Sequence, residues 1–390
     1  MLKVQQIAVI QLQNLVFGFM HRLPLKWNRG YSELVTIKSS YRQLPWTLSL
    51  VWTIPFGIAS FYSSILSAFY PQPGRLQRVD TPFHFAVGIL GLIPIAMTLQ
   101  WFKEPSCIIG FNNLNKMAWK LSKEYKFSNQ PDSILMTTSM LSIIGLLFIS
   151  FIFVFGTVAT ELDAFFFIIE PLFPVPMVRN LATILSSTIL RLVLIVPPTF
   201  EFCRYLAFLV TCIVIFYDSL IDITTPLLRF EKRIKQQHDI YVRLILIRKQ
   251  FQESLHNLLW TVLSLVFWGV VLLAWLVIKG NKVLPKSLKL LFRTDLLVVL
   301  VSLVTFLPKF TKLVTAISNV GITHRQRAKM EYGISRSVPA KIAMLRANAV
   351  RPIEFWYGSF WVIGQDFFIM YLYLMTLRVF DALIILDFQK

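Results

Sequence analysis

The strongest constraint on this chain is the number of long apolar stretches in it. A helix that crosses the hydrocarbon core of a bilayer needs about 20 mostly apolar residues. Hydrophobic residues occupy 56% of the 390 positions and charged residues only 15%, which is rare in a soluble domain. The sequence therefore predicts an all-α polytopic membrane protein. Seven stretches qualify as spans: residues 45–70, 82–101, 134–159, 200–220, 260–278, 290–310 and 363–387.

Charge decides between seven spans and eight. An eighth apolar stretch, 181–196, is interrupted by Arg191 and followed by Pro197 and Pro198. With seven spans, most of the 39 lysines and arginines fall on one side of the membrane, as the positive-inside rule requires of the cytoplasm. Counting 181–196 as a span would move the last two basic segments outside. We therefore expect a cytoplasmic N-terminus and a helix at 181–196 within an extracellular loop.

One short segment goes against this topology. It lies between the fifth and sixth spans and would be extracellular, although it is basic. Its charged residues are Lys279, Lys282, Lys286, Lys289 and Arg293. It weakens the charge argument without reversing it, because the segments on the other side are longer and carry more charge.

The spans divide the chain into six regions. A cytoplasmic N-terminal segment, 1–44, begins with an amphipathic helix. Spans one to four follow in 45–225, with the extracellular loop at 160–199. Residues 226–259 form a cytoplasmic helix whose apolar side chains recur at helical spacing. Spans five and six occupy 260–310, a cytoplasmic helical anchor 311–362, and the last span 363–390. The cytoplasmic helices either pack in a shared bundle, within one chain or between subunits, or lie along the bilayer.

Composition also excludes several classes of function. The net charge of +19 is explained by basic segments that face anionic lipid, so no nucleic-acid partner is expected. The three cysteines, Cys107, Cys203 and Cys212, have no metal-site spacing. Nothing in the sequence resembles a nucleophile with its base, so the chain is not expected to be an enzyme. No cofactor and no metal ion are expected.

Several polar and aromatic side chains fall inside the apolar stretches. Asp381 lies three residues after Arg378, so the two are expected to pair within the membrane. Glu201 and Arg204 have the same spacing and are expected to pair at the outer membrane surface. Three further residues, His84, Trp268 and Trp275, are weak candidates for a ligand pocket. The tryptophans share a helical face with Trp260, which is also compatible with lipid-facing packing.

The C-terminal stretch from Arg351 to Phe388 carries the most specific pattern. Phe355, Gly358, Phe360 and Asp366 provide an aromatic residue, a glycine with a following aromatic, and an acidic residue that opens the last span. With the seven spans and the basic cytoplasmic segments, this pattern resembles the insect chemoreceptor superfamily, and the gustatory receptors in particular. Phe388 and the apolar run before it match the end of that pattern. Phe380, Asp381 and Asp387 depart from it, so the chain resembles a divergent member.

The resemblance implies a function. Receptors of this superfamily are tetrameric, ligand-gated, non-selective cation channels of the plasma membrane of sensory neurons. Four copies of the last span surround the pore, the cytoplasmic helices form a common anchor, and a small-molecule ligand binds in the outer half of each subunit. By this resemblance Ile384, Asp387 and Phe388 line the pore or its gate. The partners would be the lipid bilayer, the unidentified ligand, and other subunits in a homotetramer or a heteromer.

Two other classes of membrane protein remain as alternatives. A G-protein-coupled receptor also has seven spans, but its N-terminus is extracellular, contrary to the charge distribution. A transporter would be expected to show paired, interrupted spans, and the sequence shows none.

Overall fold

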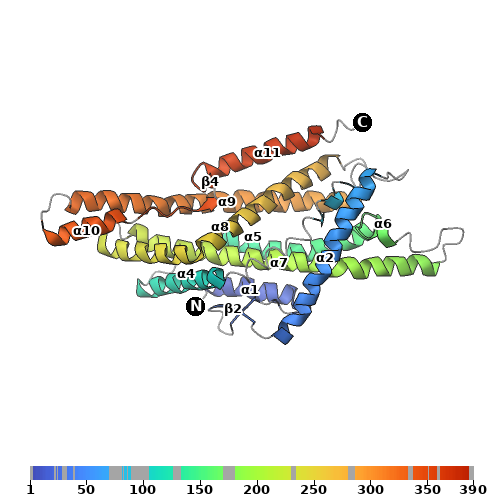
Figure 1. Ribbon diagram of the computed structural model, residues 1–390, viewed down its shortest axis with the longest axis horizontal. Helices are drawn as coiled ribbons and strands as arrows, with labels where there is room; N and C mark the ends of the chain where they lie inside the picture. Colours follow the sequence, from blue (N-terminus) through green and yellow to red (C-terminus); the bar gives the residue numbers. More distant parts are fainter. Residues whose placement is uncertain are drawn as a thin grey trace.

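The helices of the computed structural model form one elongated bundle (Figure 1). The α10 helix lies at one end of it, and α6 lies towards the other end, together with the C-terminus of α11; these are called the α10 end and the α6 end. The structure describes residues 3–21, 23, 25–28, 33–37, 40–69, 81, 83–85, 87–88, 105–125, 133–169, 181–229, 234–279, 286–332, 337–349, 351–357 and 361–385.

Helices dominate the described residues. They are α1 (Val4–Val16), α2 (Ser40–Phe69), α4 (Pro105–Glu124), α5 (Ser133–Ala159), α6 (Phe166–Ile169), α7 (Leu181–Arg229), α8 (Ile234–Lys279), α9 (Lys286–Tyr332), α10 (Val338–Ala349) and α11 (Phe367–Ile385). Two short antiparallel hairpins, which the sequence did not predict, pair β1 (Leu25–Trp27) with β2 (Leu34–Thr36) and β3 (Trp356–Tyr357) with β4 (Trp361–Val362).

Six of the described helices are long and apolar enough to cross a membrane. They are α2, α5, α7, α8, α9 and α11, and each overlaps one of the predicted spans. The remaining predicted span, 82–101, lies mostly outside the described residues; only 83–85 and 87–88 are described there, and they are helical. The described residues therefore agree with the prediction of a polytopic membrane protein.

The longest helix differs from its prediction. The sequence predicted a separate helix at 181–196 and a span that starts at Phe200, but α7 runs without a break through Pro197 and Pro198 to Arg229. Proline has the backbone φ of a helix and costs mainly one hydrogen bond and a local clash. Here α7 packs along α5, α4 and α2, and this packing holds the two halves in line. Helices in membranes tolerate proline for the same reason.

The α8 and α9 helices are also longer than a bilayer is thick. Each is roughly 70 Å long at 1.5 Å per residue, against a hydrocarbon core of about 30 Å. The predicted cytoplasmic helix at 226–259 is divided: residues 226–229 form the end of α7, and residues 234–259 are continuous with the fifth span in α8. The sixth span does not end at Phe310 but continues to Tyr332 in α9. More than half of each helix therefore extends beyond any one membrane crossing.

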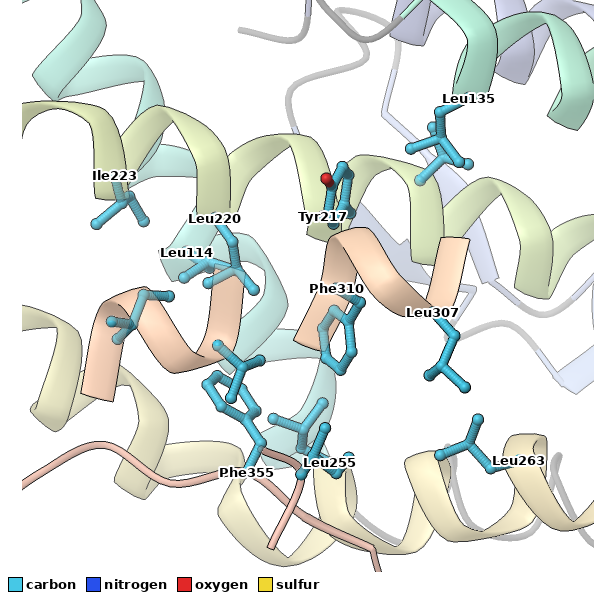
Figure 2. Packing of buried hydrophobic residues seen from close by; sticks show 14 of the residues in the cluster. Leu114, Leu135, Tyr217, Leu220, Ile223, Leu255, Leu263, Leu307, Phe310 and Phe355 are labelled. Atoms are coloured by element: carbon cyan, nitrogen blue, oxygen red, sulfur yellow. The ribbon is translucent and has the colours of Figure 1, made fainter. Parts of the chain in front are cut away.

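The main hydrophobic core lies where these extensions meet (Figure 2). Leu220 and Ile223 of α7, Phe310 of α9 and Leu255 of α8 converge on Phe355, which precedes the β3–β4 hairpin. The N-terminal helix α1 also packs into this core, against α5 and α7, and buries Val9 and Val16. The sequence had predicted α1 only as an amphipathic cytoplasmic helix.

A buried tyrosine joins α8, α9 and the segment that leads to α11. The Tyr241 hydroxyl accepts a hydrogen bond from the Ile353 backbone N–H at 2.9 Å and donates one to the Arg351 carbonyl at 3.4 Å. Burial raises the pKa of Tyr241 to about 12. The ring lies against Gly321 of α9, where an added Cβ would lie 2.8 Å from Cζ and still closer to the hydroxyl oxygen. Only a glycine fits at this crossing.

Replacing Gly321 with alanine is expected to destabilise the protein by about 1–3 kcal/mol, as overpacking in a filled core does. Tyr241 is fully buried, and the Pro352 Cα lies 3.3 Å from the added Cβ, so neither can move away easily to make room. The midpoint of heat unfolding in detergent would measure the loss. Gly269→Ala on α8 is the matched control, because nothing lies within 4 Å of its added Cβ. Equal midpoints for the two variants would contradict the close packing at Gly321.

Candidate functional site

The last helix, α11, is attached to the bundle mainly through its first two turns. Phe367 and Tyr371 are buried and stack at 5.7 Å, and the Tyr371 hydroxyl donates a hydrogen bond to the Leu263 carbonyl of α8 at 2.5 Å. The hairpin reinforces this contact, because Trp361 packs on Phe367 at 5.3 Å and the Tyr357 hydroxyl lies 2.7 Å from the Ser264 hydroxyl of α8. The start of α11 is therefore fixed to the middle of α8.

The rest of α11 lies at the edge of the bundle (Figure 1). Only 17% of its most apolar part is buried within the chain, against 72% for α7. Apart from Met370, its exposed large apolar residues recur every three or four positions, so they form one stripe along the helix. The stripe consists of Ile369, Tyr373, Leu377, Phe380 and Ile384. Among the described residues of a single chain, no side chain packs over this stripe and buries it.

The candidate pore residues fall at the end of this stripe. Ile384 is 54% exposed and belongs to it. Asp387 and Phe388 lie outside the described residues. Arg378 Nη1 lies 2.9 Å from Asp381 Oδ2, three residues further along, and both side chains are more than a third exposed. The two charges therefore face each other on the surface of α11 and are not enclosed by the chain's own helices.

The C-terminal sequence pattern divides between core and surface. Phe355 is 3% exposed and packs against Phe310 of α9 at 6.1 Å, whereas Asp366 is exposed just before α11. Gly358 and Phe360 lie outside the described residues.

An aromatic cluster fills the bundle towards the α6 end. It consists of Phe83, Phe153 of α5, Trp275 of α8 and Phe292 of α9, and Phe83 lies 6.1 Å from Phe153 and 6.3 Å from Phe292. Trp275 is 3% exposed, and its indole N–H has no hydrogen-bond partner among the described residues. His84, next to Phe83, is fully buried.

The other ligand-pocket candidate lies elsewhere. Trp268 is 60% exposed on the outside of α8, so it does not line the aromatic cluster that contains Trp275. The heptad-like spacing of the tryptophans placed them on one face of an ideal helix, but the neighbours of α8 cover that face only near Trp275.

The Glu201–Arg204 pair forms, but in a different environment from the one expected. Both side chains are almost fully buried, not at a membrane surface. Arg204 Nη2 lies 2.9 Å from the His21 ring nitrogen, and Arg204 also donates to the His21 carbonyl. The segment after α1 therefore covers this pair. The sequence could not predict that contact, because the residues are 183 positions apart.

Three further polar contacts were missed by the sequence reasoning. Lys3 and Gln6 bind Asp218 and Asp222 of α7, and Asp163 binds Arg191. His238 of α8 stacks on His324 of α9 at 5.0 Å, with Nδ1 2.9 Å from Nε2. Burial lowers the pKa of His238, which favours the neutral pair in which one ring donates and the other accepts. Arg191, Asp218 and Asp222 in or next to apolar stretches were a signal for the first two contacts, and nothing in the sequence signalled the histidine pair.

No group of three or more His, Cys, Asp or Glu side chains that could hold a metal ion occurs among the described residues.

Comparison with known proteins gives matches at the level of structure. No family model matches the sequence, and no curated protein matches it. The insect olfactory receptor OR5 from Machilis hrabei superposes with a TM-score of 0.54 at 12% sequence identity, over 97% of each chain. The structure of that receptor in complex with eugenol superposes with a TM-score of 0.53 at 10% identity, again over 97% of each chain. The chain is therefore an all-α polytopic membrane protein with the fold of an insect olfactory receptor.

Proposed function

We propose that this protein is a chemosensory receptor of the plasma membrane that acts as a ligand-gated, non-selective cation channel. The observation that carries the proposal is the likeness to an insect olfactory receptor over 97% of both chains, which includes the last helix. The binding of eugenol by that receptor supports a small organic ligand for this chain. The C-terminal sequence pattern favours a relative of the gustatory receptors. A channel of this kind is not an enzyme.

The exposed stripe on α11 supports assembly around a central pore. A helix fixed at its start and left uncovered on one face is suited to contact copies of itself, and a closed ring of identical subunits is the usual way to achieve this. A tetramer with α11 at its centre would surround the pore with Ile384, Asp387 and Phe388. The long extensions of α8 and α9 would form the cytoplasmic anchor, with the N-terminus in the cytoplasm and the C-terminus outside.

The charge distribution disfavours a G-protein-coupled receptor, whose termini would lie on the opposite sides, and the fold disfavours a transporter. A transporter would be expected to contain paired, interrupted spans, whereas α7, α8 and α9 run unbroken for 46 residues or more.

The proposal is tested by currents through the purified protein in planar bilayers, with eugenol and a panel of small aromatic alcohols and amines as probes. Asp387→Asn is expected to reduce the unitary cation conductance about two-fold or more at low salt and less at high salt, because a ring of four carboxylates concentrates cations only while screening is weak. The ligand concentration for half-maximal opening should not change.

Asp366→Asn is the matched control, since it removes an exposed carboxylate at the opposite end of α11. Conductance of Asp387→Asn equal to that of the parent at every salt concentration would remove Asp387 from the pore. A protein that binds the probes but carries no current in any of them would contradict the channel.

A further inference from the structure

An acidic residue lies on the packed face of α9 where only apolar residues are expected. The buried positions of this face recur at helical spacing and include Leu288, Phe292, Leu303, Leu307 and Phe310. Asp295 falls between Phe292 and Leu303 on the same face. The Asp295 side chain is half-buried there, and its Oδ1 atom is buried against the other helices of the bundle.

The α5, α7 and α8 helices pack against α9, and α5 and α7 place two polar side chains near Asp295. The α5 and α9 helices run in opposite directions and approach most closely at Gly156, where an added Cβ would lie 2.6 Å from Leu288. Ser150 and Asp295 are both roughly 10 Å from this crossing, at 1.5 Å per residue. Both lie close to the Cys203 thiol of α7.

None of these neighbours offers a strong hydrogen bond. Ser150 already donates its proton to the Leu146 carbonyl at 2.8 Å, and a thiol is a weak donor. Asp295 Oδ1 is buried and has no hydrogen-bond partner among the described residues. Arg204, which follows Cys203 in α7, contacts Glu201 and His21. Asp295 thus presents one buried carboxyl oxygen, within an apolar span, that no donor among the described residues reaches.

A buried carboxyl group costs folding free energy unless a donor or a cation pairs with it. An isolated carboxylate in apolar surroundings takes up a proton instead of remaining charged. Acidic residues inside membrane spans therefore usually mark a binding site or a transport path. A bound ligand can supply the donor that the described residues do not, and a cationic donor stabilises the carboxylate most.

The surroundings of Asp295 also define the rest of that partner. Phe292 lies one helical turn away, and it belongs to the aromatic cluster with Trp275 and Phe83. Aromatic faces attract both apolar groups and cations. The indole N–H of Trp275 is a second buried polar group without a partner among the described residues. An acidic side chain, Asp295, therefore lies next to an aromatic surface in this part of the bundle.

We propose that Asp295 is the counter-ion for a small organic amine whose apolar part packs against the aromatic cluster. This ligand class rests on the proposed function, in that the bound molecule is the ligand of the receptor. An alkylammonium ion from solution and the protonated Asp295 carboxyl group give an ammonium–carboxylate pair in the bundle. One proton is released to the buffer, so atoms and charge balance.

The test uses the purified full-length protein in nanodiscs and two probes of the same shape, 2-phenylethylamine and 2-phenylethanol. Calorimetric titration gives both dissociation constants, and repeating it in buffers of different ionisation enthalpy counts protons. The parent protein is expected to bind the amine with release of about one proton. Asp295→Asn should weaken amine binding about 10- to 100-fold, the range for loss of a charge-assisted hydrogen bond, and change alcohol binding by less than about three-fold.

Asp239→Asn is the matched control, because Asp239 is exposed on α8 far from this level, and it should change neither constant. Asp295→Leu is a second variant that also removes the charge and should weaken amine binding at least as much. The proposal is overturned if the parent does not bind the amine, if Asp295→Asn weakens both probes equally, or if amine binding releases no proton. Amine binding that depends on Asp295 without any current would instead contradict the channel and leave this inference standing.

Discussion

Replacing Arg191 with methionine is expected to destabilise the protein by about 3–5 kcal/mol, because it leaves a buried carboxylate without its partner. Asp163 and Arg191 are 3% and 4% exposed. Arg191 Nε donates to Asp163 Oδ2 at 2.8 Å, and Nη2 donates to the Val158 carbonyl at 3.0 Å. The guanidinium also lies 5.0 Å from the centre of the Phe166 ring. This one side chain therefore connects α7 to the end of α5 and to α6.

The loss should appear as a lower midpoint of heat unfolding in detergent and as less protein at the cell surface. The double variant Arg191→Met, Asp163→Leu should recover most of the stability, because two apolar residues can replace a buried ion pair at little cost. Arg378→Met is the matched control: it breaks an exposed pair of the same type and should cost no more than about 1 kcal/mol. If the double variant is no more stable than Arg191→Met alone, the ion pair with Asp163 does not account for the stability that Arg191 contributes.

Replacing Lys3 with methionine is expected to detach α1 from the bundle. Lys3 Nζ lies 2.9 Å from Asp222 and 3.1 Å from Asp218, and the two carboxylates are 5% and 2% exposed. Without the ammonium group they repel each other at one turn of α7. Lys3 is itself partly exposed, so the cost should be about 2 kcal/mol, below that of a fully buried pair. Hydrogen exchange in residues 4–16 should become faster by a factor of ten or more.

Lys3→Arg keeps the charge and is the control, with exchange in α1 close to that of the parent. Asp218→Asn combined with Lys3→Met should restore part of the protection, since only one buried carboxylate then remains and Gln6 can still bind the amide. Unchanged exchange in α1 of the Lys3→Met variant would mean that the apolar contacts of Val9 and Ile10 hold the helix without the ion pairs.

The sequence by itself determined that the chain is a polytopic helical protein, and roughly where its spans lie. The length of an apolar stretch and its helical periodicity are local properties of the sequence. They favour a membrane-spanning helix directly, because a helix satisfies its own backbone hydrogen bonds inside the bilayer. The ranges 134–159 and 260–278 accordingly fall within α5 and α8. The spacing of Arg378 and Asp381, and of Glu201 and Arg204, also predicted that each pair would meet, because residues three apart share a helical face.

Only the tertiary structure decided what depends on neighbouring helices. It kept α7 continuous through Pro197 and Pro198, since packing against α5 outweighs the lost hydrogen bonds of the two prolines. It buried Trp275 while leaving Trp268 exposed. It also brought Lys3 to Asp222 across 219 residues and buried the Asp295 Oδ1 atom without a hydrogen-bond partner in the described part of the chain. Such contacts are set by which helix faces meet, and the order of residues along one helix does not contain that information.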